Sequence, residues 1–104
     1  MFVRRVMALL RPNSISKFNV LMEQEVIRLL RKENGFQDEL AFFAPGEEAV
    51  TAISLWDQAS SAKAYRNGMC AEVLRKLAAL IEGMPKVDTY EMVNSAFHKI
   101  AVAA

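Results

Sequence analysis

Hydrophobic and polar positions divide the first third of the chain into a strand-like and a helix-like segment. Residues 2–10 are apolar and β-branched apart from a pair of arginines, and Pro12 ends this run, which predicts a short, mostly buried strand. From Ile15 the apolar residues recur three and four positions apart as far as Gly35. That spacing predicts an amphipathic helix over 15–33.

The middle of the chain has the pattern of a hairpin. Residues 36–44 and 49–56 are rich in apolar, aromatic and β-branched side chains, and the sequence Pro-Gly-Glu-Glu joins them. A short connection of this composition favours a tight turn between neighbouring antiparallel strands. The two segments therefore predict a β-hairpin.

The last third predicts a second helix and a last strand. Asp57 can cap a helix whose apolar side chains recur at helical spacing, and Gly83 with Pro85 would end it. An Asn-Gly pair at 67–68 can bend or interrupt this helix. Residues 86–93 alternate well enough to predict the last strand.

The order of these elements is β-α-β-β-α-β. This is the order of the ferredoxin-like α+β fold, a four-stranded antiparallel sheet with both helices on one face. A chain of 104 residues without an internal linker predicts a single domain over 1–104. Residues 94–104 continue the apolar pattern with Phe97, Ile100 and Val102. Residues 97–102 can extend the last strand, or the segment 94–104 can form a C-terminal arm that reaches a neighbouring subunit.

Both faces of the predicted sheet are apolar. In the first strand Val3, Met7 and Leu9 alternate with Val6 and Ala8, and the hairpin strands repeat this pattern. The helices can cover only one face, and a hydrophobic content of 53% is high for so small a domain. A second copy of the same sheet is the simplest cover, so the sequence predicts a homodimer.

Charge and hydropathy argue against two classes of partner. Thirteen Lys and Arg residues against twelve Asp and Glu give a net charge of +1, which offers no basic surface for nucleic acid. No apolar run approaches the roughly 20 residues of a membrane span, and the first residues lack a signal-peptide pattern. With a single cysteine, Cys70, we expect a cytoplasmic protein that binds no membrane.

The sequence also lacks motifs for a metal or a nucleotide cofactor. One His, one Cys and no pair of ligands at metal-binding spacing argue against a metal site. None of the four glycines belongs to a phosphate-binding loop. An enzyme with this sequence is therefore expected to work without a tightly bound cofactor.

Three segments resemble the antibiotic biosynthesis monooxygenase domain: VMALLRP at 6–12, NGF at 34–36 and SLWDQASSAKAYRNG at 54–68. In that family the third strand ends in an aromatic and an acidic residue, and a second aromatic residue follows in the next helix. The resemblance extends through VDTYEMV at 87–93. It implies a dimeric α+β barrel, in which two ferredoxin-like subunits place their sheets face to face and each holds a pocket between sheet and helices.

Members of this family include haem-degrading enzymes and cofactor-independent oxygenases of polycyclic aromatic or quinol substrates. The haem-degrading branch uses an Asn in the first strand, then a Trp and a His in the second helix. The matching positions here are hydrophobic, Tyr65 and Arg75, which argues against haem degradation. Other relatives carry a His in the middle of the second helix, close to where Cys70 lies in this chain.

Trp56 and Tyr65 are the first candidates for oxygenase chemistry. Cofactor-free oxygenation needs an ionisable, electron-rich substrate, an apolar chamber and hydrogen-bond donors for the resulting anion. The indole N–H and the phenol O–H can both donate from apolar rings, although both residues can equally be part of the core. His98, the only histidine, is a candidate base, with an exposed or interface position as the alternative.

Apolar and polarisable side chains are expected to line the substrate pocket. Met69 on the second helix is one candidate, and Met7, Phe42 and Cys70 are the others, each of which can equally fill the core. Arg5 can bind an anionic substrate or form a salt bridge between subunits.

Two functions of different classes follow. One is a cofactor-independent monooxygenase-like enzyme that acts on a small aromatic, quinol or similar hydrophobic substrate in a pocket between sheet and helices. The other is a non-catalytic homodimeric module of the same fold that binds a small hydrophobic molecule, which the missing helix histidine favours. Fold alone does not distinguish them.

Overall fold

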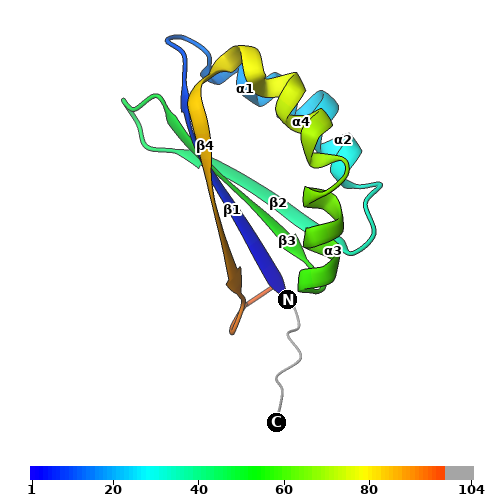
Figure 1. The fold of residues 1–104 in the computed structure, drawn as a ribbon. Coiled ribbons are helices and arrows are strands. Elements are labelled where there is room, and N and C mark those ends of the chain that lie inside the picture. Colours follow the sequence, from blue (N-terminus) through cyan, green and yellow to red (C-terminus); the bar gives the residue numbers. More distant parts are fainter. Residues whose placement is uncertain (98–104) are drawn as a thin grey trace.

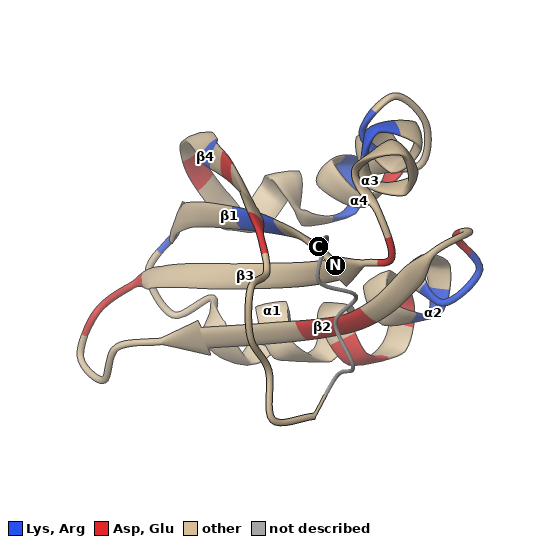
Figure 2. Cartoon of the chain, turned by 90° about the horizontal axis from the view of Figure 1, so that it is seen from below, with Lys and Arg blue, Asp and Glu red and all other residues tan. Residues whose placement is uncertain are grey.

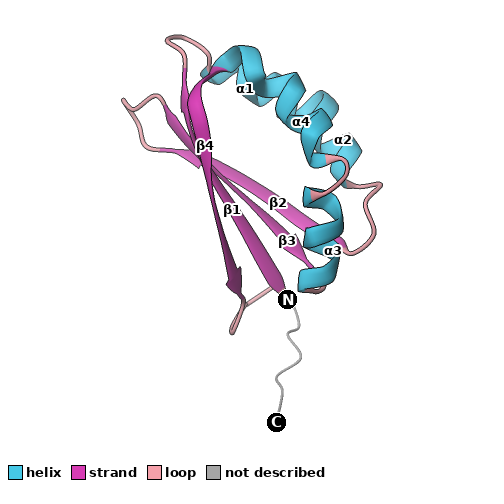
Figure 3. Cartoon of the chain, viewed as in Figure 1, coloured by secondary structure: helices cyan, strands magenta, loops and turns pink. Residues whose placement is uncertain are grey.

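The computed structural model describes residues 1–97 and has the element order that the sequence predicts (Figure 1). All helices lie on one face of a single sheet (Figure 3). In chain order the elements are β1 (Phe2–Leu10), α1 (Ile15–Leu21), the π-helical turn η1 (Met22–Val26), α2 (Ile27–Leu30), β2 (Phe36–Phe43), β3 (Ala49–Trp56), α3 (Ala59–Arg66), α4 (Cys70–Leu77), the 3-10 turn η2 (Ala78–Leu80) and β4 (Ile81–Glu91).

The sheet has the strand order β2-β3-β1-β4, and all neighbouring strands are antiparallel. This confirms the predicted ferredoxin-like α+β fold. We call the side under the helices the helix face and the other side the open face. Alternation along β1 places Arg4 and Val6 on the helix face and Arg5 and Met7 on the open face.

The core fills the space between the helix face and the helices. Trp56 is fully buried, and Leu10, Phe18, Val26 and Leu30 are nearly so. Each large apolar side chain removed from water stabilises the fold by roughly 2 kcal/mol. The helix layer is therefore held on the sheet by its apolar stripe.

A widened turn keeps that stripe in register with the sheet. Phe18, Met22, Val26 and Leu30 are each four residues apart and all four are buried. In a regular α-helix every four-residue step drifts by about 40°, so three such steps would carry Leu30 off the sheet. The Ile27 N–H bonds to the carbonyl of Met22, five residues back, and this π-helical turn absorbs the drift.

A bulge in β2 decides which of its side chains face the helices. Phe36 pairs with Trp56, but the next residue of β3, Leu55, pairs with Asp38, so Gln37 is an extra residue without an opposite partner. After the bulge, Glu39 lies opposite Ser54. Regular alternation from Phe36 would have placed Asp38 there instead.

Two of the predicted boundaries in the last third are wrong. The second helix ends with α4 at Leu77, and the last strand starts at Ile81 instead of residue 86. The interruption between Arg66 and Cys70 agrees with the prediction from the Asn-Gly pair at 67–68. Gly83 and Pro85 do not end a helix. They lie in β4 where its register with β1 shifts, and at this sheet edge a missing proline N–H costs no ladder bond.

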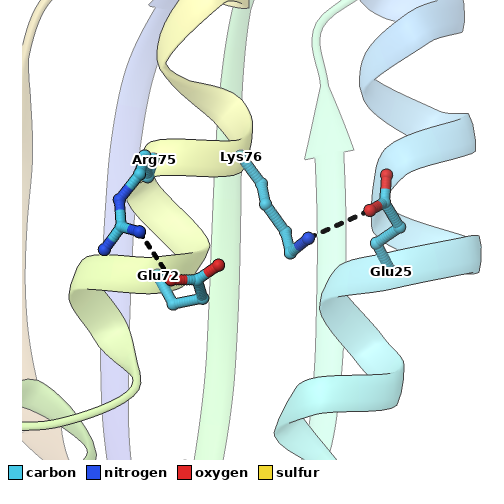
Figure 4. Close-up of polar contacts among 4 residues, drawn as sticks. All are labelled: Glu25, Glu72, Arg75 and Lys76. Carbon is cyan, nitrogen blue, oxygen red and sulfur yellow. Dashed lines mark hydrogen bonds and ion pairs between the residues drawn. The ribbon is translucent and has the colours of Figure 1, made fainter.

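Ion pairs add little to the helix layer. Lys76 Nζ lies 3.0 Å from Glu25 Oε1 and joins α4 to η1, and Arg75 lies 2.9 Å from Glu72 within α4 (Figure 4). All four side chains are partly exposed, so each pair is expected to contribute less than about 1 kcal/mol.

Candidate functional site

A small cavity lies between the helix face and the helices. Its volume is about 70 Å³, which is room for a few water molecules. Most of its lining is apolar. The exceptions are Arg4 from β1, Glu39 from β2, Ser54 from β3, Tyr65 from α3 and Cys70 from α4.

The polar lining begins with a row across the sheet. Glu39 pairs with Ser54, and Ser54 pairs with Arg4, so the three residues lie side by side on β2, β3 and β1. Figure 2 shows the same arrangement as an acidic segment of β2 and a basic segment of β1 on either side of the uncharged β3. A basic and an acidic side chain therefore flank a hydroxyl on the floor of the cavity.

Arg4 is a buried cation without a carboxylate bonded to it. Its side chain donates from Nη2 to the Cys70 sulfur at 3.3 Å and lies 5.5 Å from the centre of the Tyr65 ring. None of the ion pairs formed within residues 1–97 includes Arg4, and its Nε has no hydrogen-bond partner there. A guanidinium stays charged in proteins, so this site favours an anion.

Glu39 is a carboxyl group with an unused oxygen. Burial and, after it, the charge of Asp38 raise the pKa of Glu39 to about 8, although Arg4 acts in the opposite direction. Its Oε1 is buried and has no hydrogen-bond partner among the described residues. At neutral pH this carboxyl group is therefore mostly protonated, and it ionises only near pH 8.

Trp56 and Tyr65 form the aromatic side of the site. Their ring centres are 5.1 Å apart, because α3 folds back and brings the two rings together. Tyr65 lines the cavity, and burial, followed by the nearby Cys70, raises the pKa of its phenol, which keeps the hydroxyl protonated and able to donate.

Trp56 supports the site without lining it. Its ring is fully buried, and its indole N–H donates to the hydroxyl of Ser54 at 2.9 Å. The Ser54 hydroxyl in turn donates to the carbonyl of Arg4 at 3.5 Å. The indole N–H of Trp56, a predicted donor to a ligand, therefore orients Ser54 instead.

A larger groove adjoins the cavity. It runs between α3 and α4 on one side and β1 and β4 on the other, and its volume is about 700 Å³, within the range typical of small-molecule sites. The groove and the cavity share Arg4, Cys70 and Leu74 in their walls. A ligand in the groove would therefore meet the guanidinium at the entrance to the cavity.

The other predicted site residues lie away from the cavity. Met69 is half-buried near Tyr65 on the outer side of α3 and α4, and Met7 and Phe42 lie on the open face with exposed fractions of 41% and 48%. Alternation of the strands puts these two side chains behind the sheet. His98 lies outside the described residues.

Arg5 also lies on the open face. It donates to Asp88 of β4 at 2.9 Å, and this hydrogen bond raises the pKa of Arg5. Of the two expectations for Arg5, the salt bridge is therefore formed within the chain, away from the cavity.

Sequence reasoning missed the charged part of the site. The position of Arg4 could have been predicted, because it lies two and four residues before Val6 and Ala8 and therefore shares their face of the sheet. The position of Glu39 could not have been predicted, because the bulge at Gln37 shifts the alternation of β2 by one residue.

The structure adds two observations on ligands and membranes. Within residues 1–97, no three His, Cys, Asp or Glu side chains lie close enough together to hold a metal ion. No helix in the same part of the chain is long and apolar enough to span a bilayer.

The fold is found in solved structures, although no family model and no curated protein matches the sequence. A monooxygenase from the ActVA-Orf6 gene of Streptomyces coelicolor, in complex with Nanaomycin D, superposes with a TM-score of 0.77 at 19% identity, covering 94% of this chain and 92% of that chain. An antibiotic biosynthesis monooxygenase superposes with a TM-score of 0.70 at 12% identity, covering 90% of this chain and 100% of that chain.

A mutant of MhuD with two manganese protoporphyrin IX molecules in each active site gives a TM-score of 0.75 at 14% identity, covering 94% of this chain and 100% of that chain. At these identities the likeness concerns the fold. The chain therefore has the ferredoxin-like α+β fold of the antibiotic biosynthesis monooxygenases.

Proposed function

We propose that this protein is a cofactor-independent monooxygenase that acts on a small aromatic or quinol substrate. The observation that supports this most is the convergence of Arg4, Glu39 and Tyr65 at an apolar cavity beside a ligand-sized groove. The Streptomyces coelicolor monooxygenase of the same fold, solved in complex with Nanaomycin D, adds support by analogy.

The proposed reaction uses the electrons of the substrate. An ionised phenol ring is oxidised to a quinone, one atom of O₂ becomes the new carbonyl oxygen, and the other leaves as water with the two hydrogens removed. The protein's part is to exclude water, stabilise the phenolate and admit O₂ through the apolar lining. Tyr65 would donate a hydrogen bond to the anion, and Trp56 would hold Ser54 in place.

A non-catalytic binding module is the second candidate. The observation that favours it is the size of the cavity, because about 70 Å³ does not hold an aromatic ring together with O₂ unless the wall at Leu74 moves. In this alternative the ligand stays in the groove and Arg4 only binds it.

Oxygen uptake distinguishes the two functions. Metal-free protein is incubated with a panel of quinols and polycyclic phenols, with heat-treated protein as the control, while the fluorescence of Trp56, the only tryptophan, reports binding. Catalysed O₂ consumption supports the monooxygenase. Quenching of fluorescence without O₂ consumption supports the binding module. If the protein shows neither quenching nor O₂ consumption, both proposed functions are contradicted.

We also propose that a second copy of the chain covers the open face. Met7, Leu9 and Phe42 on that face have exposed fractions of 41%, 59% and 48%, a pattern typical of an interface. Residues 94–104 would form the proposed arm across the partner. Of these, 98–104 lie outside the described residues, and Phe97 has an exposed fraction of 94%.

The reducing cytoplasm is our proposed location. Cys70 is buried as a free thiol beside Arg4, and a thiol with a role in the wall of the site is best preserved in a reducing compartment.

A further inference from the structure

The cavity holds a guanidinium and a carboxyl group whose hydrogen bonding is incomplete. Glu39 has a buried oxygen without a partner, and Arg4 has a buried Nε without one. Each would normally be costly at such a place. They lie two strands apart on the same face with Ser54 between them, which puts their Cα atoms about 10 Å from each other.

We propose that Glu39 accepts the proton of a phenolic ligand and that Arg4 binds the phenolate that remains. This inference rests on the proposed function and adds to it the residue that ionises the substrate. A phenol oxygen placed above Ser54 would lie between the two side chains, with its ring toward the apolar roof or the groove.

The proton transfer balances without a further reactant. The phenol O–H bond breaks, its electron pair stays on the phenol oxygen, and the proton forms an O–H bond with the free Oε1 of Glu39. The negative charge thereby moves from the carboxylate toward Arg4. The buried cation gains an anion, and the carboxyl group becomes neutral where burial favours neutrality.

The groups around Glu39 fit this role. Burial, and after it Asp38 on the same strand, disfavour its carboxylate, whereas Arg4 on β1 favours it. Tyr65 and Cys70 approach from α3 and α4. The helix segments α1, η1 and α2 present only apolar side chains to the cavity, namely Phe18, Met22, Val26 and Leu30. Glu39 is thus the only carboxyl group that lines the cavity among residues 1–97.

Local backbone geometry makes the placement specific. The bulge at Gln37 brings Glu39, and not Asp38, opposite Ser54. Bulges of this kind often re-aim a side chain next to an active site. The π-helical turn, which is also frequent at functional sites, supplies Met22 and Val26 to the opposite wall of the same cavity.

Infrared spectroscopy with 2-naphthol tests the inference directly. Under anaerobic conditions at pH 9, where Glu39 is mostly ionised before binding, 2-naphthol should produce a new carboxylic-acid C=O band together with naphtholate absorbance. Its methyl ether, 2-methoxynaphthalene, has no proton to give and should produce neither. This comparison uses only the wild-type protein and so does not depend on how a variant folds.

Variants assign the band to a residue. Glu39→Gln should lose the new band, and Glu47→Gln, the same change on the exposed hairpin turn, should keep it. For any quinol that is turned over, kcat/KM of the wild type should rise with pH through about 8, and Glu39→Gln should lower it by about 100-fold, the usual contribution of a general base.

The outcomes separate this inference from the proposed function. Naphtholate bound without a carboxylic-acid band, or a band that persists in Glu39→Gln, would overturn the inference alone. Absence of 2-naphthol binding, measured by Trp56 fluorescence, would overturn the inference and the proposed function together. A band without O₂ consumption in air would support the proton transfer and contradict the monooxygenase.

Discussion

Gly35 shows how a single residue positions the aromatic side of the site. It has a positive φ of 83°, and its carbonyl accepts a hydrogen bond of 2.8 Å from the N–H of Asp57, where β3 passes into α3. A Cβ at Gly35 would overlap the side chains of Asp57 and Ser61. Only glycine combines this backbone angle with the close approach.

Gly35→Ala is therefore expected to lower the free energy of unfolding by about 2 kcal/mol or more. Gly46 is the matched control, because it has the same φ of 83° but open space around it, so Gly46→Ala should cost only about 1 kcal/mol. Urea denaturation midpoints measure both. Equal losses for the two variants would show that the approach of Gly35 to α3 is unimportant.

Tyr65 is the residue whose catalytic role is simplest to test. Tyr65→Phe keeps the ring against Trp56 and removes only the hydroxyl, so the fold should survive. Turnover of a quinol should fall by about 100-fold, the scale of a lost hydrogen-bond donor. Tyr90→Phe, on the half-exposed ring of the open face, should leave turnover unchanged. Unchanged turnover in Tyr65→Phe would make Tyr65 a core residue only.

Glu39 gives the folded protein a specific pH dependence. Its pKa is about 8 in the folded chain against an ordinary value of 4.5, so the folded state holds this proton more tightly than the unfolded state. The stabilisation is fully present below pH 4.5 and is lost as the pH rises through 8. Its upper limit is about 5 kcal/mol, at roughly 1.4 kcal/mol for each pKa unit.

Glu39→Gln should remove this dependence. Its unfolding free energy relative to the wild type should increase from pH 5 to about pH 8 and then level off, and that of the exposed control Glu47→Gln should not. Chemical denaturation at each pH measures the difference. Parallel curves for the wild type and Glu39→Gln would mean that Glu39 titrates normally.

At the scale of elements, periodicity predicted the fold and local irregularities hid part of the site. The first strand, the first helix and the hairpin follow the spacing of their apolar residues, and the Trp56–Tyr65 pair follows from their separation across a strand end and a helix. The position of Glu39 on the helix face was not predicted, because one extra residue changes the alternation of side chains along β2. The start of β4 was predicted too late, because Gly83 and Pro85 break helices but are tolerated in a strand at a sheet edge.

The ion pair between Lys76 and Glu25 links α4 to η1 across the helix layer (Figure 4). Because both side chains are partly exposed, a double-mutant cycle with Lys76→Met and Glu25→Gln should give a coupling of about 0.5 kcal/mol that decreases in high salt. The same cycle on Arg75 and Glu72, within one helix, should give a similar or smaller value. A coupling above about 2 kcal/mol would mean that this pair fixes the packing of the helices.

At the scale of the whole molecule, the open face predicts the assembly. Light scattering should give about twice the chain mass of 11.7 kDa, and Phe42→Glu should yield monomers because a charge would be buried between the sheets. Val20→Glu is the control, since Val20 is half-exposed on α1, away from this face. A wild-type monomer at micromolar concentration would contradict the dimer.

The C-terminal arm is tested by deletion. Removing residues 95–104 should weaken the dimer, seen as dissociation at a higher protein concentration than for the full chain. Unchanged dissociation would show that the arm lies outside the interface.

The π-helical turn at Met22–Val26 and the bulge at Gln37 share a property that concerns the length of the chain. Each is a regular element with one residue inserted, since removal of Gln24 would restore three- and four-residue spacing to the helix, and removal of Gln37 would restore unbroken pairing in β2. A chain two residues shorter should therefore keep the same core. Both irregularities flank one cavity, so this shorter chain would show whether the shape of the cavity depends on them.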